Sequence, residues 1–194
     1  MADTQYKMFR PDFSTASDAR VLRTREALRD SLLELLNDNS FAKISVREIV
    51  DHAKVGYNTF FRHYPDKDAI LKDIAYEEIR RLVNLSTPIL DSVDTQAACL
   101  AVCAYVWESR TLWKTLLTGG AAGALREEYL RRAREVAETR FRGKDWLPLE
   151  IGVILVISGT FELLAWWLSE KKPLPVERVA RIYQRIVVSP VVDP

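Results

Sequence analysis

The chain has 194 residues, of which 48% are hydrophobic, enough for one substantial core or for a small domain joined to a larger one. Its 28 Lys and Arg residues against 27 Asp and Glu leave a formal net charge of +1, which excludes polyanion binding by the whole surface and makes any nucleic-acid contact local. Two cysteines are too few for a secreted disulfide framework, and the N-terminus lacks the apolar segment of a signal peptide. We therefore expect a cytoplasmic protein.

The first folded element is predicted to begin near residue 18. Residues 1–17 mix Asp, Thr, Ser, Pro and isolated aromatics without helical periodicity, which predicts a flexible arm. From there to a stop at residues 37–40, apolar side chains recur at helical spacing and build one stripe. The stripe consists of Val21, Leu28, Leu32, Leu35 and Leu36.

Residues 45–64 have the pattern of two short helices joined by a tight turn. Ser45 and Glu48 form a capping box, in which the hydroxyl accepts from the Glu48 amide and the carboxylate reaches back to the Ser45 amide. A second helix is predicted to start there and to end before residues 54–56, where Gly56 suits a tight turn. Another short helix follows through Tyr64, so the segment is predicted to be a helix-turn-helix.

The remainder of the chain is also predicted to be helical. Pro65 stops the preceding helix, and Asp66 can cap a helix that runs to about Leu85, with Thr87-Pro88 closing the N-terminal unit. Glycines and prolines then separate further helical segments, and no stretch alternates like a sheet. These segments lie near residues 95–107, 109–118, 122–141, 147–169 and 175–188.

Residues 44–71 resemble the signature of the TetR family of transcriptional regulators. They read ISVREIVDHAKVGYNTFFRHYPDKDAIL, with a Ser-capped second helix, Ala and Val before the turn, Thr-Phe-aromatic in the recognition helix, His-aromatic after it and Lys at the next helix start. The resemblance covers about 50 residues and implies an all-α fold. It implies a helix-turn-helix DNA-binding domain of three helices at residues 18–66, followed by a larger effector-binding and dimerisation domain at 67–194.

The physics of a helix-turn-helix independently predicts which side chains reach DNA. Its second helix enters the major groove, where base edges differ in their donors, acceptors and methyl groups. Arg47 is the strongest candidate for a base contact, because a guanidinium can bridge two acceptors on guanine, and Lys67 resembles the family's phosphate anchor. The full set of expected DNA contacts is Arg47, Lys54, Gly56, Tyr57, Asn58, Thr59, His63 and Lys67.

Two positions depart from the family pattern, and several have plainer alternatives. Phe61 stands where the family often has Tyr, so a hydroxyl contact to phosphate is missing, and Gly56 stands where it often has a capping Ser. Arg47 could instead be a solvated surface residue, and His63 a helix-end cap. Phe60 is expected in the core, and we expect Phe61 and Tyr64 to pack against the first or fourth helix.

The segment at residues 147–168 is the most apolar and is predicted to be a dimer helix. Its length also suits a membrane span, but Glu150 and Glu162 would be costly in lipid. A second helix at 176–188 would complete a two-fold four-helix interface. The predicted contact face consists of Gly152, Val156, Gly159, Leu163 and Trp166, and we expect Trp167 at the interface as well.

An apolar effector pocket is expected in the C-terminal domain. Aromatic, aliphatic and cysteine side chains at helical spacing could line it, although such residues are more often ordinary core. The expected effector contacts are Cys103, Tyr105, Trp107, Trp113, Leu116, Leu117, Tyr129 and Phe161.

Catalysis is not expected, because no phosphate-binding loop, Ser/His/Asp set or paired metal motif occurs. No cofactor or metal is expected, and Cys99 with Cys103 makes a poor zinc site, with a redox pair as the alternative. We expect a cytoplasmic homodimer that binds a palindromic double-stranded DNA operator and is released by a small apolar or amphipathic effector. An activator, a membrane-associated or structural helical protein and an enzyme are the alternatives.

Overall fold

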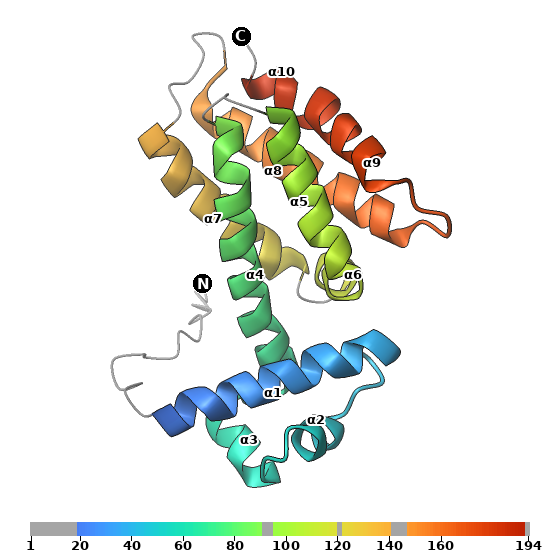
Figure 1. Cartoon of the computed structure of the whole chain (residues 1–194). Coiled ribbons are helices and arrows are strands. Elements are labelled where there is room, and N and C mark those ends of the chain that lie inside the picture. The colour runs from blue at the N-terminus through green and yellow to red at the C-terminus, as the bar shows by residue number, and fades with distance from the viewer. Residues whose placement is uncertain (1–18, 91–94, 120–121, 141–146, 193–194) are drawn as a thin grey trace, which may run out of the picture.

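The computed structural model describes residues 19–90, 95–119, 122–140 and 147–192, which form helices joined by short loops (Figure 1). The predicted all-α fold is confirmed. The flexible arm expected at residues 1–17 lies outside the described residues.

Three helices form a small N-terminal unit. Helix α1 (Ala19–Asp38) lies across α2 (Val46–His52) and α3 (Tyr57–His63), as Figure 1 shows. The predicted stripe on α1 supplies much of the core, since its leucines at 28, 32 and 36 are buried together with Ile49 of α2 and Phe60 of α3. Burial of these side chains is the main source of stability for helices as short as α2 and α3.

Helix α4 (Lys67–Leu90) leaves this unit and rises into the larger domain (Figure 1). It begins as predicted, because the Asp66 carboxylate accepts from the backbone N–H of Ala69 at 2.8 Å. It does not end at Thr87-Pro88, where the sequence predicted the close of the N-terminal unit, but continues to Leu90. Pro88 cannot donate to the Asn84 carbonyl, and the helix continues for only two residues beyond it.

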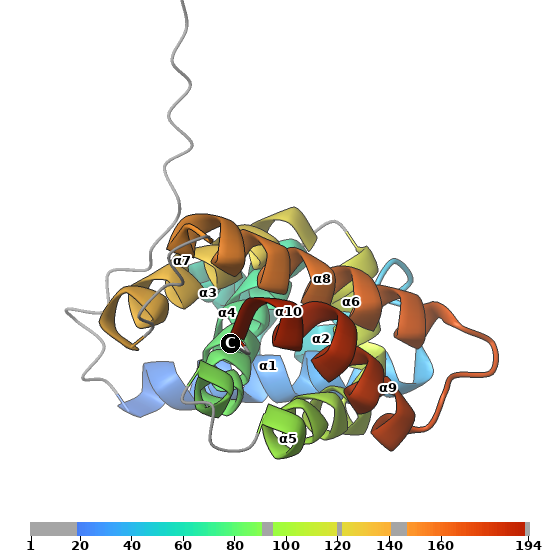
Figure 2. The same ribbon diagram turned by 90° about the horizontal axis from the view of Figure 1, so that it is seen from above.

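The larger domain is a bundle of helices around α4. It contains α5 (Thr95–Glu108), α6 (Arg110–Thr118), α7 (Ala122–Arg140) and α8 (Leu149–Ser169). Helix α4 packs against α5 and α7, and α7 packs against α8. Figure 2 shows α8 beside the C-terminal helical run. The bounds of these helices agree with the predicted segments to within two residues.

The C-terminal run differs from the single helix expected at residues 175–188. It consists of α9 (Val176–Ile182), a π-helical turn η2 (Tyr183–Val188) and α10 (Ser189–Val192). Pro190 gives a reason, because it has no N–H for the carbonyl of Ile186 and its ring crowds that carbonyl in an α-helix. In the wider turn the Ser189 N–H bonds to the Gln184 carbonyl instead. A π-turn is invisible to a search for 3.6-residue periodicity.

The glycines of α8 were predicted to contact a second subunit, and this is wrong. A Cβ atom on Gly159 would lie 2.9 Å from Val187 Cγ1, and one on Gly152 would lie 3.1 Å from Val191 Cγ1. Both glycines therefore allow α8 to approach the C-terminal run of the same chain. Trp167 is also internal, since it is fully buried and its Nε1 donates to the Leu174 carbonyl at 2.8 Å.

A different apolar face of α8 remains exposed. Ile151, Leu155 and Trp166 are 47%, 53% and 44% exposed, and Ile186 of the adjacent η2 is 70% exposed. Helix α8 is long and apolar enough to cross a membrane by length and composition, a test that a core helix also passes. Its opposite side is buried in the bundle, where α8 packs against α6, α7 and η2.

The start of α4 is fastened to the loop between α1 and α2. The Lys67 ammonium donates to the backbone carbonyls of Phe41 at 2.9 Å, Ala42 at 3.3 Å and Ile44 at 2.8 Å. It also lies 4.7 Å from the centre of the Phe41 ring, within reach of a cation–π interaction. One side chain thus donates to three backbone carbonyls of the loop between α1 and α2.

We predict that Lys67→Met lowers the free energy of unfolding by about 1–3 kcal/mol, because three carbonyls lose a charged donor while the aliphatic stem is kept. Chemical denaturation measures the change. Lys72→Met, at an exposed position of the same helix, is the matched control and should change stability by less than about 0.5 kcal/mol. Equal losses in the two variants would contradict the fastening role.

Candidate DNA-binding surface and ligand cavity

Helix α2 has the predicted capping box and presents Arg47 to solvent. Ser45 Oγ accepts from the Glu48 amide at 3.2 Å, and Glu48 Oε2 accepts from the Ser45 amide at 2.7 Å. These hydrogen bonds to Ser45 lower the pKa of Glu48. The Arg47 side chain is 82% exposed and lies 4.0 Å from the Asp51 carboxylate, a weak ion pair that leaves the guanidinium available.

The turn between α2 and α3 is built differently from the expectation. Lys54, not Gly56, has the left-handed backbone, with φ of 56°. Gly56 has φ of −64° and ψ of 139° and precedes α3 as an N-cap without a side-chain hydrogen bond. Gly56 is therefore not required by the turn, whereas Lys54 pays a steric cost that a glycine would avoid.

Helix α3 presents an aromatic pair to solvent. Tyr57 is 51% and Phe61 47% exposed, and their rings meet edge to face with centres 5.2 Å apart. The expectation that Phe61 packs against the first or fourth helix is wrong, because Phe60 occupies the inward position and is fully buried. Asn58 is also exposed, and Thr59 is half-buried.

Sequence reasoning also missed Arg62, an exposed cation on α3 whose charge and position on the recognition helix were the available signal. Its neighbour His63 is half-buried. Burial, with the positive charges of Arg25 and Arg62, lowers the pKa of His63, so the imidazole is neutral at pH 7. A neutral imidazole can still donate a hydrogen bond to phosphate but brings no charge.

Tyr64 packs against α1 and α4, as expected. Its hydroxyl donates to Asp73 Oδ2 at 2.6 Å and accepts from Arg25 Nε at 3.3 Å. Arg25 also binds Asp73 at 2.9 Å, and its guanidinium lies 5.4 Å from the centre of the Tyr64 ring. Burial and Asp73 raise the pKa of Tyr64 to about 12. This cluster joins α1, the end of α3 and α4.

The structure changes what is expected of Lys67. Its ammonium was expected to hold a DNA phosphate, but it already donates to the three carbonyls of residues 41, 42 and 44. An ammonium has three donors, so none remains for a phosphate. Any contact of Lys67 with DNA would therefore come through its backbone at the start of α4.

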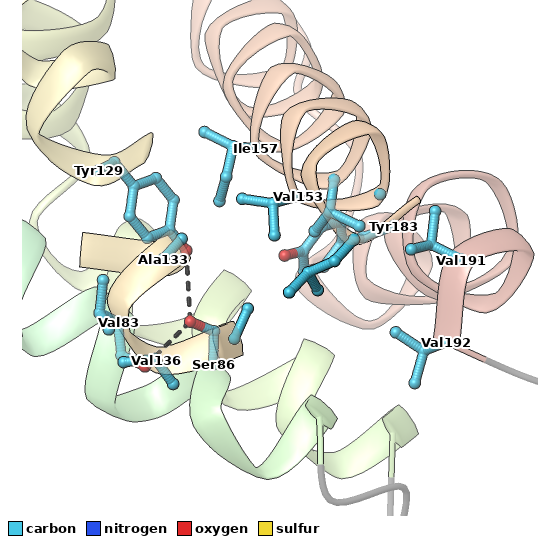
Figure 3. Close-up of a pocket in the computed structure, with 14 residues that line it drawn as sticks. Val83, Ser86, Tyr129, Ala133, Val136, Val153, Ile157, Tyr183, Val191 and Val192 are labelled. Atoms are coloured by element: carbon cyan, nitrogen blue, oxygen red, sulfur yellow. Dashed lines mark hydrogen bonds between the residues drawn. The ribbon is translucent and has the colours of Figure 1, made fainter. Parts of the chain in front are cut away.

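An apolar cavity lies in the larger domain, at the end away from α2 and α3. The empty space between its walls, open mouth included, is about 660 Å³. Helices α4, α7 and α8 and the C-terminal run supply the walls (Figure 3). The lining residues are Val83, Ser86, Tyr129, Ala133, Val136, Ala137, Leu149, Gly152, Val153, Val156, Ile157, Tyr183, Val191 and Val192.

Of the eight expected effector contacts, Tyr129 alone lines this cavity. Large aromatic side chains fill space instead of lining it: the ring of Trp107 stacks on Trp167 at 4.9 Å, and the Tyr105 hydroxyl donates to Glu78 at 2.6 Å. Phe161 is buried beside the Tyr129 ring. The other four, all buried in the core, are Cys103, Trp113, Leu116 and Leu117.

The two thiols are buried as well. Burial, with the nearby Cys99 thiol, raises the pKa of Cys103 to about 12, so it is protonated and unreactive at neutral pH. Within the described ranges, no group of three or more His, Cys, Asp or Glu side chains could hold a metal ion.

Comparison with known families identifies the N-terminal unit. Residues 28–74 match the family model described as bacterial regulatory proteins, tetR family. This match identifies the N-terminal unit as a TetR-family DNA-binding domain. The match runs from the buried stripe of α1 to the Asp73 cluster of α4 and so includes the whole helix-turn-helix. The chain therefore has the DNA-binding domain of a transcriptional regulator. A search of curated proteins finds no match.

Solved structures of the family have the same fold over most of the chain. A TetR transcriptional regulator from Streptococcus agalactiae 2603V is 22% identical, with a TM-score of 0.59, over 89% of this chain and 98% of that one. FadR of Thermus thermophilus, solved with lauroyl-CoA, is 18% identical, with a TM-score of 0.59, over 85% and 93%. FadR of Bacillus subtilis, solved with stearoyl-CoA, is 14% identical, with a TM-score of 0.62, over 86% and 98%.

We predict that Lys54→Gly is more stable than Lys54→Ala by about 1 kcal/mol, because both lose the same charge and only glycine relieves the left-handed backbone. Thermal and chemical unfolding measure the difference. If Lys54 contacts a phosphate, the two variants should lose the same affinity for DNA. A less stable glycine variant would contradict the strain at this position.

Proposed function

We propose that this TetR-family regulator is a homodimeric repressor that leaves a palindromic operator when a small apolar molecule enters the cavity. The observation that carries the proposal is the path of α4. Its first turn is fastened to the helix-turn-helix by Lys67, and its later turns carry Val83 and Ser86 on the cavity wall. One continuous helix therefore joins the DNA-binding surface to the ligand cavity.

The DNA side of the proposal rests on exposed groups at the end of the molecule opposite the cavity (Figure 1). We assign base contacts to Arg47 and to Tyr57, Asn58 and Thr59 at the start of α3, which would enter the major groove. Phosphate contacts are assigned to Lys54, His63 and the backbone amides at Gly56 and Lys67. Phe61 and Arg62 join this set because both are exposed on α3.

The coupling rests on how firmly the first half of α4 is held. Asp73 binds Arg25 and Tyr64 near the DNA-binding unit, and the half-buried Tyr105 of α5 donates to Glu78 in the middle of the helix. A ligand that favours a different position of Val83 and Ser86 would move α4 as a rod and carry the recognition helix with it. Binding and operator release would then be linked by a single coupling free energy.

The dimer rests on the exposed apolar face of α8 and η2. Ile151, Leu155, Trp166 and Ile186 form a surface that a two-fold partner could cover with the same residues. A dimer presents two recognition helices, which suits a palindromic operator. Repression is supported by the Thermus thermophilus relative, described as a TetR-family repressor in complex with lauroyl-CoA. We place the protein in the cytoplasm, with its DNA.

We predict that the purified protein enriches a palindrome from a random duplex pool and that Arg47→Ala lowers affinity for it by about 5- to 150-fold, the equivalent of 1–3 kcal/mol for a bidentate base contact. Fluorescence anisotropy at stated salt measures the affinity. Arg80→Ala is the matched control, because Arg80 is exposed on α4 and paired with Glu77. Equal losses for both variants would remove Arg47 from the interface.

We predict that Leu155→Arg converts the dimer to a monomer and weakens operator binding, because a charge is placed in an apolar interface. Sedimentation velocity measures the assembly. Leu100→Arg, at an apolar position of α5 that is 38% exposed, should remain dimeric. A Leu155→Arg dimer of unchanged affinity would place the interface on another face.

A further inference from the structure

We propose that the cavity selects a neutral ligand, a hydrocarbon body with one carbonyl or hydroxyl oxygen, and rejects carboxylates and other anions. This inference rests on the proposed effector site and names its ligand class. The described walls of the cavity support it in two ways, through the absence of charge and through the arrangement of three hydroxyl groups.

The walls match a hydrocarbon. Ten of the fourteen lining residues are Ala, Val, Leu or Ile, one is Gly152, and the other three carry hydroxyl groups. Among these fourteen described lining residues, none is charged. An anion that entered would exchange its water for aliphatic side chains without gaining a counter-charge, which is a heavy penalty, whereas an alkyl chain would be stabilised by the same walls.

Three arginines on the surface of α7, beside the cavity, already pair with carboxylates. Arg131 and Arg132 of α7 both bind Glu128, each at 2.6 Å, and Arg134 lies 3.4 Å from Glu150 of α8. Turning one of these guanidiniums toward the cavity would break an ion pair on the surface and bury the charge. These three guanidiniums therefore offer no ready partner for a carboxylate, and Arg126 of the same helix is exposed and donates to Ser158 Oγ at 2.6 Å.

The hydroxyl groups can meet one polar atom of a ligand. Ser86 Oγ donates to the carbonyl of Leu82 at 2.9 Å or to that of Val83 at 3.0 Å. Ser86 Oγ also lies 3.3 Å from Tyr129 Oη. Because the one hydrogen of the serine hydroxyl points to a carbonyl, Tyr129 is the donor in this contact. That distance is long for a bond between hydroxyls. A ligand oxygen that accepts a shorter bond from Tyr129 would replace it at little cost. Figure 3 shows the hydroxyl of Tyr129 reaching toward Ser86 beside the cavity.

Tyr183 supplies a second hydroxyl from the opposite wall. Figure 3 shows it entering from the C-terminal run, across the cavity from Tyr129. Its hydroxyl is hydrogen-bonded to Thr160 Oγ1 at 3.0 Å, and Thr160 also bonds to the Val156 carbonyl at 2.6 Å. Burial raises the pKa of Tyr129 to about 12 and raises that of Tyr183 as well, so both remain neutral phenols. Neutral phenols donate and accept, which suits a carbonyl or alcohol oxygen.

The test compares ligands of equal length and different charge. Isothermal titration of the full chain at pH 8 would use 2-octanone and 2-decanone against octanoate and decanoate, all below micellar concentrations. We expect each ketone to bind at least about 100-fold more tightly than the carboxylate of the same length. Tyr129→Phe should weaken ketone binding by about 3- to 10-fold, because one hydrogen bond is lost. Thr118→Val is the control, since it removes a hydroxyl from an exposed residue of α6, a helix that does not line the cavity.

The outcomes separate the ligand class from the effector role. Carboxylates that bind as tightly as ketones would overturn the neutral class, and so would ketones that fail to bind at either length. Equal losses in Tyr129→Phe and Thr118→Val would overturn the role of the Tyr129 hydroxyl. Release of the selected operator is measured in parallel: ketones that bind without releasing DNA would leave the ligand class standing and contradict the proposed repressor mechanism.

Discussion

The fixed start of α4 is the constraint on which the rest of the structure depends. The Lys67 ammonium gathers three carbonyls of the loop before α2, and one turn and a half later Asp73 binds Arg25 of α1 and the Tyr64 hydroxyl. Both contacts are partly buried, where charged hydrogen bonds are stronger than at an exposed surface. They set the direction in which α4 leaves the three-helix unit, and hence where the larger domain is built.

This arrangement separates two chemically different ends. One end carries exposed polar, cationic and aromatic groups on α2 and α3, suited to the grooves and phosphates of DNA. The other end encloses an aliphatic cavity with three hydroxyl groups. Because α4 belongs to both ends, the proposed effector would act on the DNA-binding unit through a packed helix whose first turn is held by Lys67.

Most residues that line the cavity are aliphatic, and the packing of the bundle explains why. Trp113 and Trp167 are fully buried in the bundle, and Trp107 is half-buried and stacks on Trp167. Space remains where α7 and α8 present Ala133, Gly152 and other short side chains. Large aromatics therefore stabilise the domain, and short side chains make room for a ligand. For this reason, choosing aromatic residues from the sequence predicted effector contacts that mostly lie in the core.

Much of the fold could be predicted because its signals are local. The capping box of Ser45 and Glu48, the cap at Asp66 and the stripe of α1 depend on neighbours within a few residues, and each was confirmed. The family resemblance of residues 44–71 rests on the same short range and agrees with the matched family model. For the proposed DNA contacts, the sequence indicated exposed residues on α3, although it placed Phe61 inward.

The features that only the tertiary structure decided depend on residues that are far apart in the sequence. The glycines of α8 lie against Val187 and Val191, and Tyr183 lies across the cavity from Tyr129, an arrangement that no local pattern encodes. The Lys67 ammonium was assigned to DNA because its charge was visible, while the three carbonyls that occupy it lie more than twenty residues earlier. The sequence by itself determined the helices, their caps and the family, because these follow from local hydrogen bonding and periodicity. Packing decided which residues face the cavity, the exposed face and the core, because that depends on how whole helices meet.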